Sequence, residues 1–418
     1  MQTTRLYQHD RYIKEWDAVI TSITDNGDNL VITLDKTAFF PEGGGQSCDL
    51  GSIGPYTIID VQEKDEEVIH TAMIPSADDA KGTAAYAEGL PAAGDTVSCS
   101  IDWDRRFDNM QRHCGEHILS GIFFSMYGGV NRGFHMGQDY MTVDISLEAD
   151  PEVKEITYED ALAAELEANK VIWSDAPVTV MHFESRDEAE KMPLRKALAF
   201  DEDITIVSVG SIDNAADCVA CCGTHPNTAG QVGLIKIYKV ENYKGMFRIY
   251  FEAGERAMND YRAKHNVLTT LSNRYSSSIE DFPSKLKVQE EKLAEAKSEL
   301  FQIKKIFMEN EYEKVDRLLE ETEGNVVTYE VEGLSLDDIF NMAKRYMSNC
   351  AKLLMLYSIK DTSYILVSDG NIDCGSLVKE YASFYKGKGG GNKVSARGIF
   401  TSKEDAEMFA DLIRKHLR

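Results

Sequence analysis

Gln111-Arg-His-Cys-Gly-Glu-His-Ile-Leu119 is the stretch that decides how this chain is organised, together with Cys218-Val-Ala-Cys-Cys-Gly-Thr-His225 about 100 residues later. The two histidines of the first stretch are four residues apart, so on a helix they share one face. The second stretch repeats this spacing between a cysteine and a histidine, with a glycine that allows a tight turn. Three imidazoles and one thiolate form a borderline-soft donor set that suits tetrahedral zinc. We therefore expect one Zn2+ per chain, bound by His113, His117, Cys221 and His225.

Other interpretations of these two stretches remain open at the level of sequence. A histidine pair at this spacing often has no function, and a cysteine-rich turn could be a buried core or a separate small metal knot. The repeated spacing favours one shared site. Cys218 and Cys222 compete with Cys221 as the thiolate ligand, and the register with His225 favours Cys221.

Composition places the chain among globular proteins of reducing compartments. Its 418 residues suffice for roughly two to four domains, and 43% of them are hydrophobic. The chain contains no run of about 18 apolar residues, the length that a membrane-spanning helix needs. The first residues also lack the apolar segment of a secretory signal. The eight cysteines read as thiols and not as a disulfide framework, so we expect a cytoplasmic protein without a membrane partner. The net charge of −25 argues against broad nonspecific nucleic-acid binding but leaves room for a local basic surface.

Residues 1–103 read as a small β-barrel. Short runs of β-branched residues, such as Asn29-Leu-Val-Ile-Thr-Leu34, are separated by turn signals. Pro41-Glu-Gly-Gly-Gly-Gln46 interrupts these strands, because three consecutive glycines do not suit a strand interior. The glycines either let the backbone approach a ligand closely or form a flexible hairpin turn, and composition alone favours the turn.

Residues 104–255 read as an α+β domain that contains both candidate metal-binding stretches. The first stretch lies on a helix, and a second, amphipathic helix is expected at 158–171. Strands are expected at 140–147, 178–183, 204–209 and 234–240.

Residues 256–323 read as a helical linker. Leu286, Leu293, Leu300 and Phe307 recur every seven residues, which suits either a coiled coil or an antiparallel helical hairpin.

Residues 324–418 read as an α/β domain, with strands near 325–329, 352–357 and 363–367 alternating with helices. A glycine-rich loop precedes the last helix. It could cradle phosphate with its backbone amides and cations, or it could be a solvated turn. Its cations are Lys386, Lys388, Lys393 and Arg397.

Several motifs resemble, in chain order, the editing domain of alanyl-tRNA synthetase and its free-standing relatives, the AlaX trans-editing proteins. These motifs are Thr37-Ala-Phe-Phe-Pro-Glu-Gly-Gly-Gly-Gln46, the histidine pair and Cys221-x-Gly-Thr-His225. Residues 247–256 are similar to the segment that closes that domain. The helical stretch and residues 387–398 resemble the DHH-associated domain of the synthetase and of long AlaX proteins. The family usually has Cys-Gly-Gly-Thr-His, so Cys222 is a departure that would stiffen the turn.

The resemblance implies a multi-domain α+β protein that hydrolyses the ester of serine, and of glycine, mischarged on the tRNA for alanine. No stretch ahead of the expected barrel is long enough for an aminoacylation domain, so we expect an editor without its synthetase. Zinc would hold a water or the substrate amino group. The resemblance also implies a tRNA-binding C-terminal domain that carries the four cations named above, with homodimer formation through this region as a further expectation.

The resemblance implies roles for single residues as well. Thr37 would sense the serine hydroxyl, and Gln46 would lie near the reacting end. Glu116 could be a base or support a ligand, although its place beside His117 equally suits a solvated side chain. The residues that would line the substrate pocket are Gly43, Gly44, Gly45 and His135.

Three rival functions are a non-catalytic zinc- and tRNA-binding protein, an editor of another aminoacyl ester such as the serine-removing domain of threonyl-tRNA synthetase, and a phosphoesterase. The glycine loop before Gln46 and the C-terminal domain argue against the second. The chain lacks an Asp-His-His motif, which argues against the third.

Overall fold

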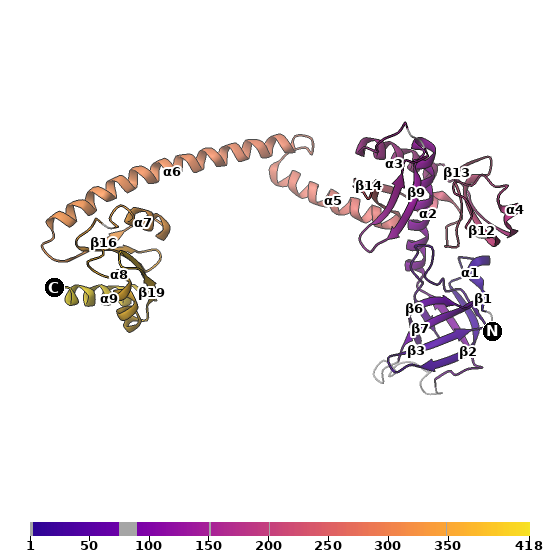
Figure 1. Ribbon diagram of the computed structural model, residues 1–418, viewed down its shortest axis with the longest axis horizontal. Helices are drawn as coiled ribbons and strands as arrows, with labels where there is room; N and C mark the ends of the chain where they lie inside the picture. Colours follow the sequence, from indigo (N-terminus) through magenta and orange to yellow (C-terminus); the bar gives the residue numbers. More distant parts are fainter. Residues whose placement is uncertain (1–2, 75–89, 150–151, 200, 348) are drawn as a thin grey trace. The chain divides into compact units, whose positions relative to one another are not determined.

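The computed structural model describes residues 3–74, 90–149, 152–199, 201–347 and 349–418 (Figure 1). The chain divides into two compact units, Met1–Leu271 and Ser272–Arg418. The four-part division expected from sequence is finer than this and stays a prediction. In the described ranges, no helix is both long enough and apolar enough to cross a membrane.

The first unit begins with the closed six-stranded barrel that the sequence predicts. Its strands lie in the order β2-β3-β7-β6-β5-β8, and alternate side chains such as Ile20, Ile32 and Val61 fill the interior. A short parallel pair, β1 (Thr4–Arg5) and β4 (Lys36–Thr37), lies outside this closed set, and helix α1 (Leu6–His9) follows β1. The barrel strands are β2 (Glu15–Asp25), β3 (Asn29–Leu34), β5 (Gly51–Ile53), β6 (Tyr56–Lys64), β7 (Glu67–Met73) and β8 (Thr96–Ile101).

Helix α2 (Trp103–Tyr127) is the central element of the first unit. The Asp102 side chain caps its N-terminus by accepting a hydrogen bond from the Arg105 amide, and Gly128, at φ 62°, ends it in the left-handed conformation. Most of the helix is buried, because it packs on the four-stranded sheet β14-β15-β10-β9. These strands are β9 (Val130–Met136), β10 (Met141–Ser146), β14 (Ile235–Tyr243) and β15 (Met246–Ala253).

A second helix and a second sheet complete this unit. The predicted helix is confirmed as α3 (Tyr158–Trp173), which starts at a capping box formed by Thr157 and Asp160. A three-stranded antiparallel sheet, β11-β12-β13, leads to the Cys-His stretch. Its strands are β11 (Val178–Ser185), β12 (Glu202–Ser211) and β13 (Asn214–Ala220), with the short helices α4 (Arg186–Ala189) and η2 (Ala229–Val232) nearby in sequence.

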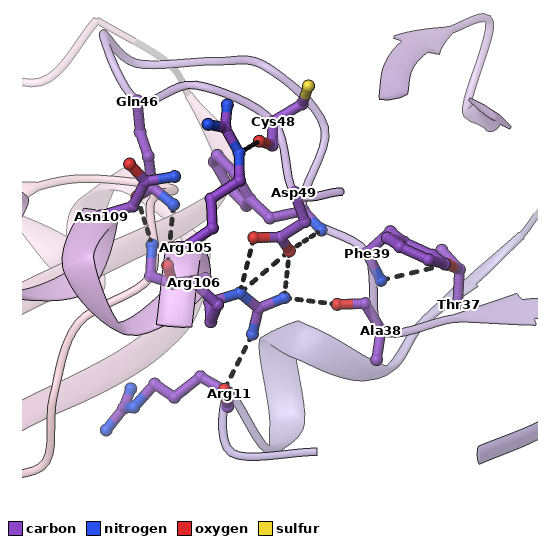
Figure 2. Close-up of polar contacts among 12 residues, drawn as sticks. Arg11, Thr37, Ala38, Phe39, Gln46, Cys48, Asp49, Arg105, Arg106 and Asn109 are labelled. Carbon is purple, nitrogen blue, oxygen red and sulfur yellow. Dashed lines mark hydrogen bonds and ion pairs between the residues drawn. The ribbon is translucent and has the colours of Figure 1, made fainter. Parts of the chain in front are cut away.

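A buried ion pair joins the barrel to α2 (Figure 2). The Arg106 guanidinium is fully buried and pairs with the buried carboxylate of Asp49. It also donates to the carbonyl oxygens of Ala38 at 2.5 Å and Arg11 at 2.8 Å, while Asp49 accepts from the Phe40 amide at 2.6 Å. These contacts fix the loop that runs from β4 to Asp49, and this loop carries the three glycines and Gln46.

The second unit is a five-stranded mixed sheet, β16-β17-β18-β20-β19, packed against helices. The end of the long helix α6 (Phe282–Glu321) joins its core through the buried Val315. The side chains of Leu286, Leu293, Leu300 and Phe307 on this helix are 36–56% exposed. The strands are β16 (Val326–Val331), β17 (Leu353–Ser358), β18 (Ser363–Val367), β19 (Lys388–Gly391) and β20 (Ser395–Ile399). The other helices are α7 (Leu336–Ala343), α8 (Cys374–Tyr381), η3 (Ala382–Tyr385) and α9 (Lys403–His416), and α5 (Gly254–Tyr275) spans the boundary between the units.

The glycine-rich segment of this unit forms a β-hairpin, not the loop expected from sequence. Gly389–Gly391 lie in the edge strand β19, which pairs with β20. Gly389 faces α8, where an added Cβ would lie 2.9 Å from a Val378 side-chain carbon and 1.9 Å from the carbonyl oxygen of Arg397. The glycines are therefore required because the helix and the neighbouring strand approach so closely.

Candidate metal centre

The two stretches singled out in the sequence meet at one point in the first unit. His113 and His117 project from α2, with ring centroids 5.2 Å apart, and Cys221 and His225 follow β13. The four ligand atoms all lie within 4.8 Å of one another. All three imidazoles are buried. This arrangement suits one metal ion held by three nitrogens and a sulfur.

Nδ1 of each imidazole faces an oxygen atom, through a hydrogen bond in His113 and His225 and through an ion-pair contact in His117. Nδ1 of His113 lies 2.9 Å from Oε1 of Gln46, and Nδ1 of His225 lies 3.1 Å from the carbonyl oxygen of Gly223. Nδ1 of His117 lies 3.0 Å from a carboxylate oxygen of Asp217. Because Nδ1 of each ring faces an oxygen atom, Nε2 is left to bind a metal. Metal-binding histidines usually have such a partner at the ring nitrogen that does not bind the metal.

Cys221 is the thiolate of this group. Its Sγ lies 3.5 Å from Nε2 of His113 and 3.9 Å from Nε2 of His225. Burial by itself would raise the pKa of Cys221, but the three surrounding imidazoles hold it well below the usual range of a thiol. A thiol that ionises readily is a good metal donor.

The competing cysteines are placed elsewhere. Cys218 packs in an apolar cluster with Ile204 and Ile206, where burial raises its pKa to about 11. Cys222 is exposed and lines the cavity described below. Neither belongs to the metal-binding group found among the described residues.

Asp217 contacts a candidate ligand, although the sequence analysis did not single it out. Its carboxylate is buried between His117 and Arg195, whose Nε donates to it at 2.5 Å. Burial alone would raise the pKa of Asp217, but the hydrogen bonds and charges of these two partners lower it. The only indication of this contact in the sequence is that Asp217 precedes the candidate ligand Cys221 by four residues.

Gln46 contacts both metal-binding stretches and is not among the residues that line the cleft described below. Its side chain is fully buried. Besides contacting His113, its Oε1 accepts from the Thr224 amide at 3.0 Å, and its Nε2 donates to the Thr224 hydroxyl at 2.8 Å. The amide group therefore joins the barrel loop to both metal-binding stretches.

Gly223 is the residue that lets the Cys-His turn pass so close to α2. A Cβ added there would lie 2.2 Å from Cε1 and 2.4 Å from Nδ1 of His113. Only glycine fits at this distance, so its role is close approach as much as turn formation.

A cleft of about 720 Å³ opens over the metal-binding group. Three of the four candidate ligands line it, namely His113, His117 and Cys221. Gly43 and Gly44 line it as expected, but Gly45 does not, because its Cα faces the ring of Phe134, which an added Cβ would meet at 2.8 Å. The glycines form a turn closed by paired backbone hydrogen bonds between Gly43 and Gln46.

Of the alternatives left open for Glu116, the solvated side chain is wrong. Glu116 is three residues from His113, and residues at this spacing are neighbours on a helix. Its side chain is buried, lines the cleft, and accepts hydrogen bonds at Oε1 from Ser120 Oγ and Asn131 Nδ2, both at 2.6 Å.

Thr37 and His135 are not brought to this cleft. Thr37 is fully buried, and its hydroxyl contacts His70 Nε2 at 2.9 Å and accepts from the Phe39 amide at 3.1 Å. Because the side chain is fully buried, a contact with a substrate hydroxyl would require neighbouring residues to move. His135 lines a separate hollow of about 290 Å³ on the sheet, beside Thr142 and Tyr250.

The four C-terminal cations lie together on the β19–β20 hairpin or next to it. All are exposed, and none forms an ion pair with a described residue. Lys388 and Arg397 share the sheet face opposite α8, because Arg397 pairs with Gly390 and side chains two apart on a strand point the same way. This places a basic surface on an otherwise acidic chain.

Comparisons with known proteins agree with this site. A family model described as "Threonyl and Alanyl tRNA synthetase second additional domain" matches residues 204–250, which include Cys218 and the candidate ligand Cys221. A DHHA1 domain model matches residues 323–418.

Three relatives cover the chain to different extents. It is 28% identical over 432 residues to the alanyl-tRNA editing protein AlaX-L of Pyrococcus horikoshii, which spans 99% of each chain. It is 28% identical to the alanine–tRNA ligase of Pyrococcus abyssi, with 99% of this chain but 44% of the ligase aligned. It is 34% identical over 258 residues to the alanyl-tRNA editing protein AlaX-M of Methanosarcina acetivorans, which spans 60% of this chain and 98% of that protein. With its His-His-Cys-His group and this coverage, the chain belongs to the AlaX family of alanyl-tRNA editing proteins.

Proposed function

We propose that this protein is a trans-editing hydrolase that removes serine and glycine from mischarged tRNA for alanine. The observation that carries the proposal is the convergence of three oriented Nε2 atoms and one thiolate at the base of a cleft. A cleft of about 720 Å³ is in the size range of small-ligand sites. The AlaX relatives are alanyl-tRNA editing proteins, which supports alanyl-tRNA as the substrate class.

Zinc is the metal that best suits this donor set. When bound, it would polarise a carbonyl or lower the pKa of a water. The protein itself does the positioning: Gln46, Asp217 and Gly223 fix the three imidazole rings, and the cleft holds the aminoacyl group beside them. An aminoacyl ester is already activated, so positioning and charge stabilisation can supply much of the rate.

The test is deacylation of seryl, glycyl and alanyl esters on the same tRNA by the full-length protein. We expect the seryl and glycyl esters to be cleaved and the alanyl ester to be spared. If all three esters survive with metal bound, the proposal fails and a non-catalytic zinc- and tRNA-binding protein takes its place.

The metal assignment has its own test. His113→Ala and Cys221→Ala should each contain less zinc than the parent protein when the purified proteins are compared by elemental mass spectrometry. His135→Ala is the matched control, because this histidine lies in the other hollow, and it should retain full zinc. Full zinc content in all three variants would show that the metal assignment is wrong.

We also propose that the basic hairpin holds the body of the tRNA. The four exposed cations, free of ion pairs with described residues, support this role. Replacing all four with alanine should weaken tRNA binding and reduce the slope of log affinity against log salt concentration by roughly 3 to 4. An unchanged slope would show that the hairpin does not contact the tRNA. The variant should still cleave a short substrate that consists only of the aminoacylated 3′ end.

Formation of a homodimer through the C-terminal region remains a proposal. The exposed apolar side chains on α6, repeated every seven residues, support it. Sedimentation of the protein should give a dimer, and Leu293→Glu together with Leu300→Glu should give a monomer. A monomeric parent protein would contradict it.

A further inference from the structure

A carboxylate that forms no ion pair with any described residue faces the cleft next to the metal-binding group. Glu116 is about 5% exposed and lines the cleft together with His113 and His117. Its Oε1 is fixed by two neutral donors, the Ser120 hydroxyl and the Asn131 side-chain amide. These donors orient the carboxylate, but they do not neutralise its charge. A charge this deeply buried normally has an ionic partner.

The cations around the cleft do not supply that partner. Each arginine that lines the cleft already pairs with its own acid, and none of these acids is Glu116. The pairs are Arg5–Glu63, Arg132–Glu148 and Arg195–Asp217. Lys196 also lines the cleft, but its side chain is exposed and forms no ion pair with a described residue. The cleft therefore presents an oriented anion, adjacent to the metal-binding face of α2, that a ligand could neutralise.

We propose that Glu116 binds the α-ammonium group of the aminoacyl ester, an inference that rests on the proposed function. In such an ester the ammonium nitrogen is attached to the carbon next to the carbonyl that reacts. A carboxylate next to His117 and three residues from His113 is placed to hold that nitrogen while the carbonyl lies near the Nε2 atoms. Glu116 would thus restrict the site to esters with a free amino group and exclude N-acylated esters, such as those of peptidyl-tRNA.

Three other roles for Glu116 predict different results. As a general base, it would act on free and N-acylated esters alike. As a counter-charge to the metal, its loss would lower metal affinity. If Glu116 only stabilises the packing of β9 on α2 through its hydrogen bond with Asn131, its replacement would lower thermal stability.

The experiment compares Glu116→Gln with the parent protein on two substrates, the seryl ester and the N-acetyl-seryl ester of the same tRNA. The parent should cleave the free-amine ester at least 10-fold faster. Loss of a hydrogen bond between charged groups should lower kcat/KM of the variant for that ester roughly 10- to 100-fold. Its kcat/KM for the N-acetyl ester should not change. Glu159→Gln changes an exposed acid in the first turn of α3 that does not line the cleft, so this control variant should behave like the parent.

Equal losses on both esters, or an unchanged preference for the free amine, would overturn the inference. A parent protein that cleaves neither ester would overturn the proposed function, and the inference with it. Metal content and melting temperature of Glu116→Gln show whether the site is intact.

A second measurement needs no variant. The parent protein should bind 3′-seryl-amino-3′-deoxyadenosine, which has an amide in place of the ester, at least 10-fold more tightly than its N-acetyl derivative. Equal affinities in calorimetry would also overturn the inference, whatever the variant does.

Discussion

Replacing Gly223 with alanine should remove His113 from the metal site. The added Cβ would lie 2.2 Å from Cε1 of His113, whereas ordinary contact begins near 3.4 Å, so the ring must retreat by about 1 Å. Metal–ligand distances tolerate shifts of only about 0.2 Å. The backbone of Gly223 cannot yield freely, because its carbonyl oxygen holds Nδ1 of His225. One nitrogen ligand should therefore be lost.

Loss of an outer hydrogen-bond partner of a ligand already costs roughly 10- to 100-fold in metal affinity, so loss of the ligand itself should cost at least about 100-fold. The assay is competition for zinc against a coloured chelator. Gly43→Ala is the matched control, because it lines the same cleft, adopts no left-handed conformation and has only a carbonyl oxygen at 4.0 Å from an added Cβ. Equal zinc affinity of Gly223→Ala and Gly43→Ala would refute the steric argument.

Three further predictions concern the supports of the site and of the barrel. Gln46→Ala should lower zinc affinity roughly 10- to 100-fold, whereas Gln62→Ala should not, because Gln62 is exposed and contacts no candidate ligand among the described residues. Equal zinc affinities in chelator competition would contradict this. His70 is buried, and burial lowers its pKa to about 4, below the value of about 6.5 expected in the unfolded chain, so the unfolded state gains protons first as the pH falls. Stability should therefore decrease between about pH 6.5 and pH 4 by up to about 3 kcal/mol, and His70→Leu should remove that decrease in urea unfolding followed by tryptophan fluorescence. Arg106→Ala should cost about 3–5 kcal/mol because it leaves a buried carboxylate unpaired. Calorimetry should show a much smaller effect for Arg105→Ala, because the part-buried Arg105 side chain donates to the Cys48 carbonyl oxygen and pairs with no acid among the described residues.

Patterns that repeat over short distances predicted the barrel, the helices and the metal-binding group. His113 and His117 could be paired from sequence because helix geometry alone brings them together. The same geometry places Glu116, three residues from His113, beside that ligand on the helix. Cys221 could be preferred over Cys218 because spacing to His225 carries that information.

Features set by tertiary packing could not be read in this way. The two glycine triplets have the same composition but different structures: Gly43–Gly45 form a turn, whereas Gly389–Gly391 form an edge strand under α8. What separates them is the neighbouring helix, which no local pattern shows. Likewise, the Thr37 hydroxyl is engaged by His70, thirty-three residues away, and this contact exists only once the barrel has closed.

The hydrogen bond from His113 to Gln46 joins two parts of the first unit that are far apart in sequence. The ligands come from α2 and from the segment after β13, whereas Gln46 belongs to a loop of the barrel region. By thermodynamic linkage, if docking of that loop tightens metal binding, then metal must stabilise the docked loop by the same free energy. Zinc supply would then set how firmly the loop that carries Gly43 and Gly44 is held against the cleft, so metal depletion would loosen this loop as well as remove the metal.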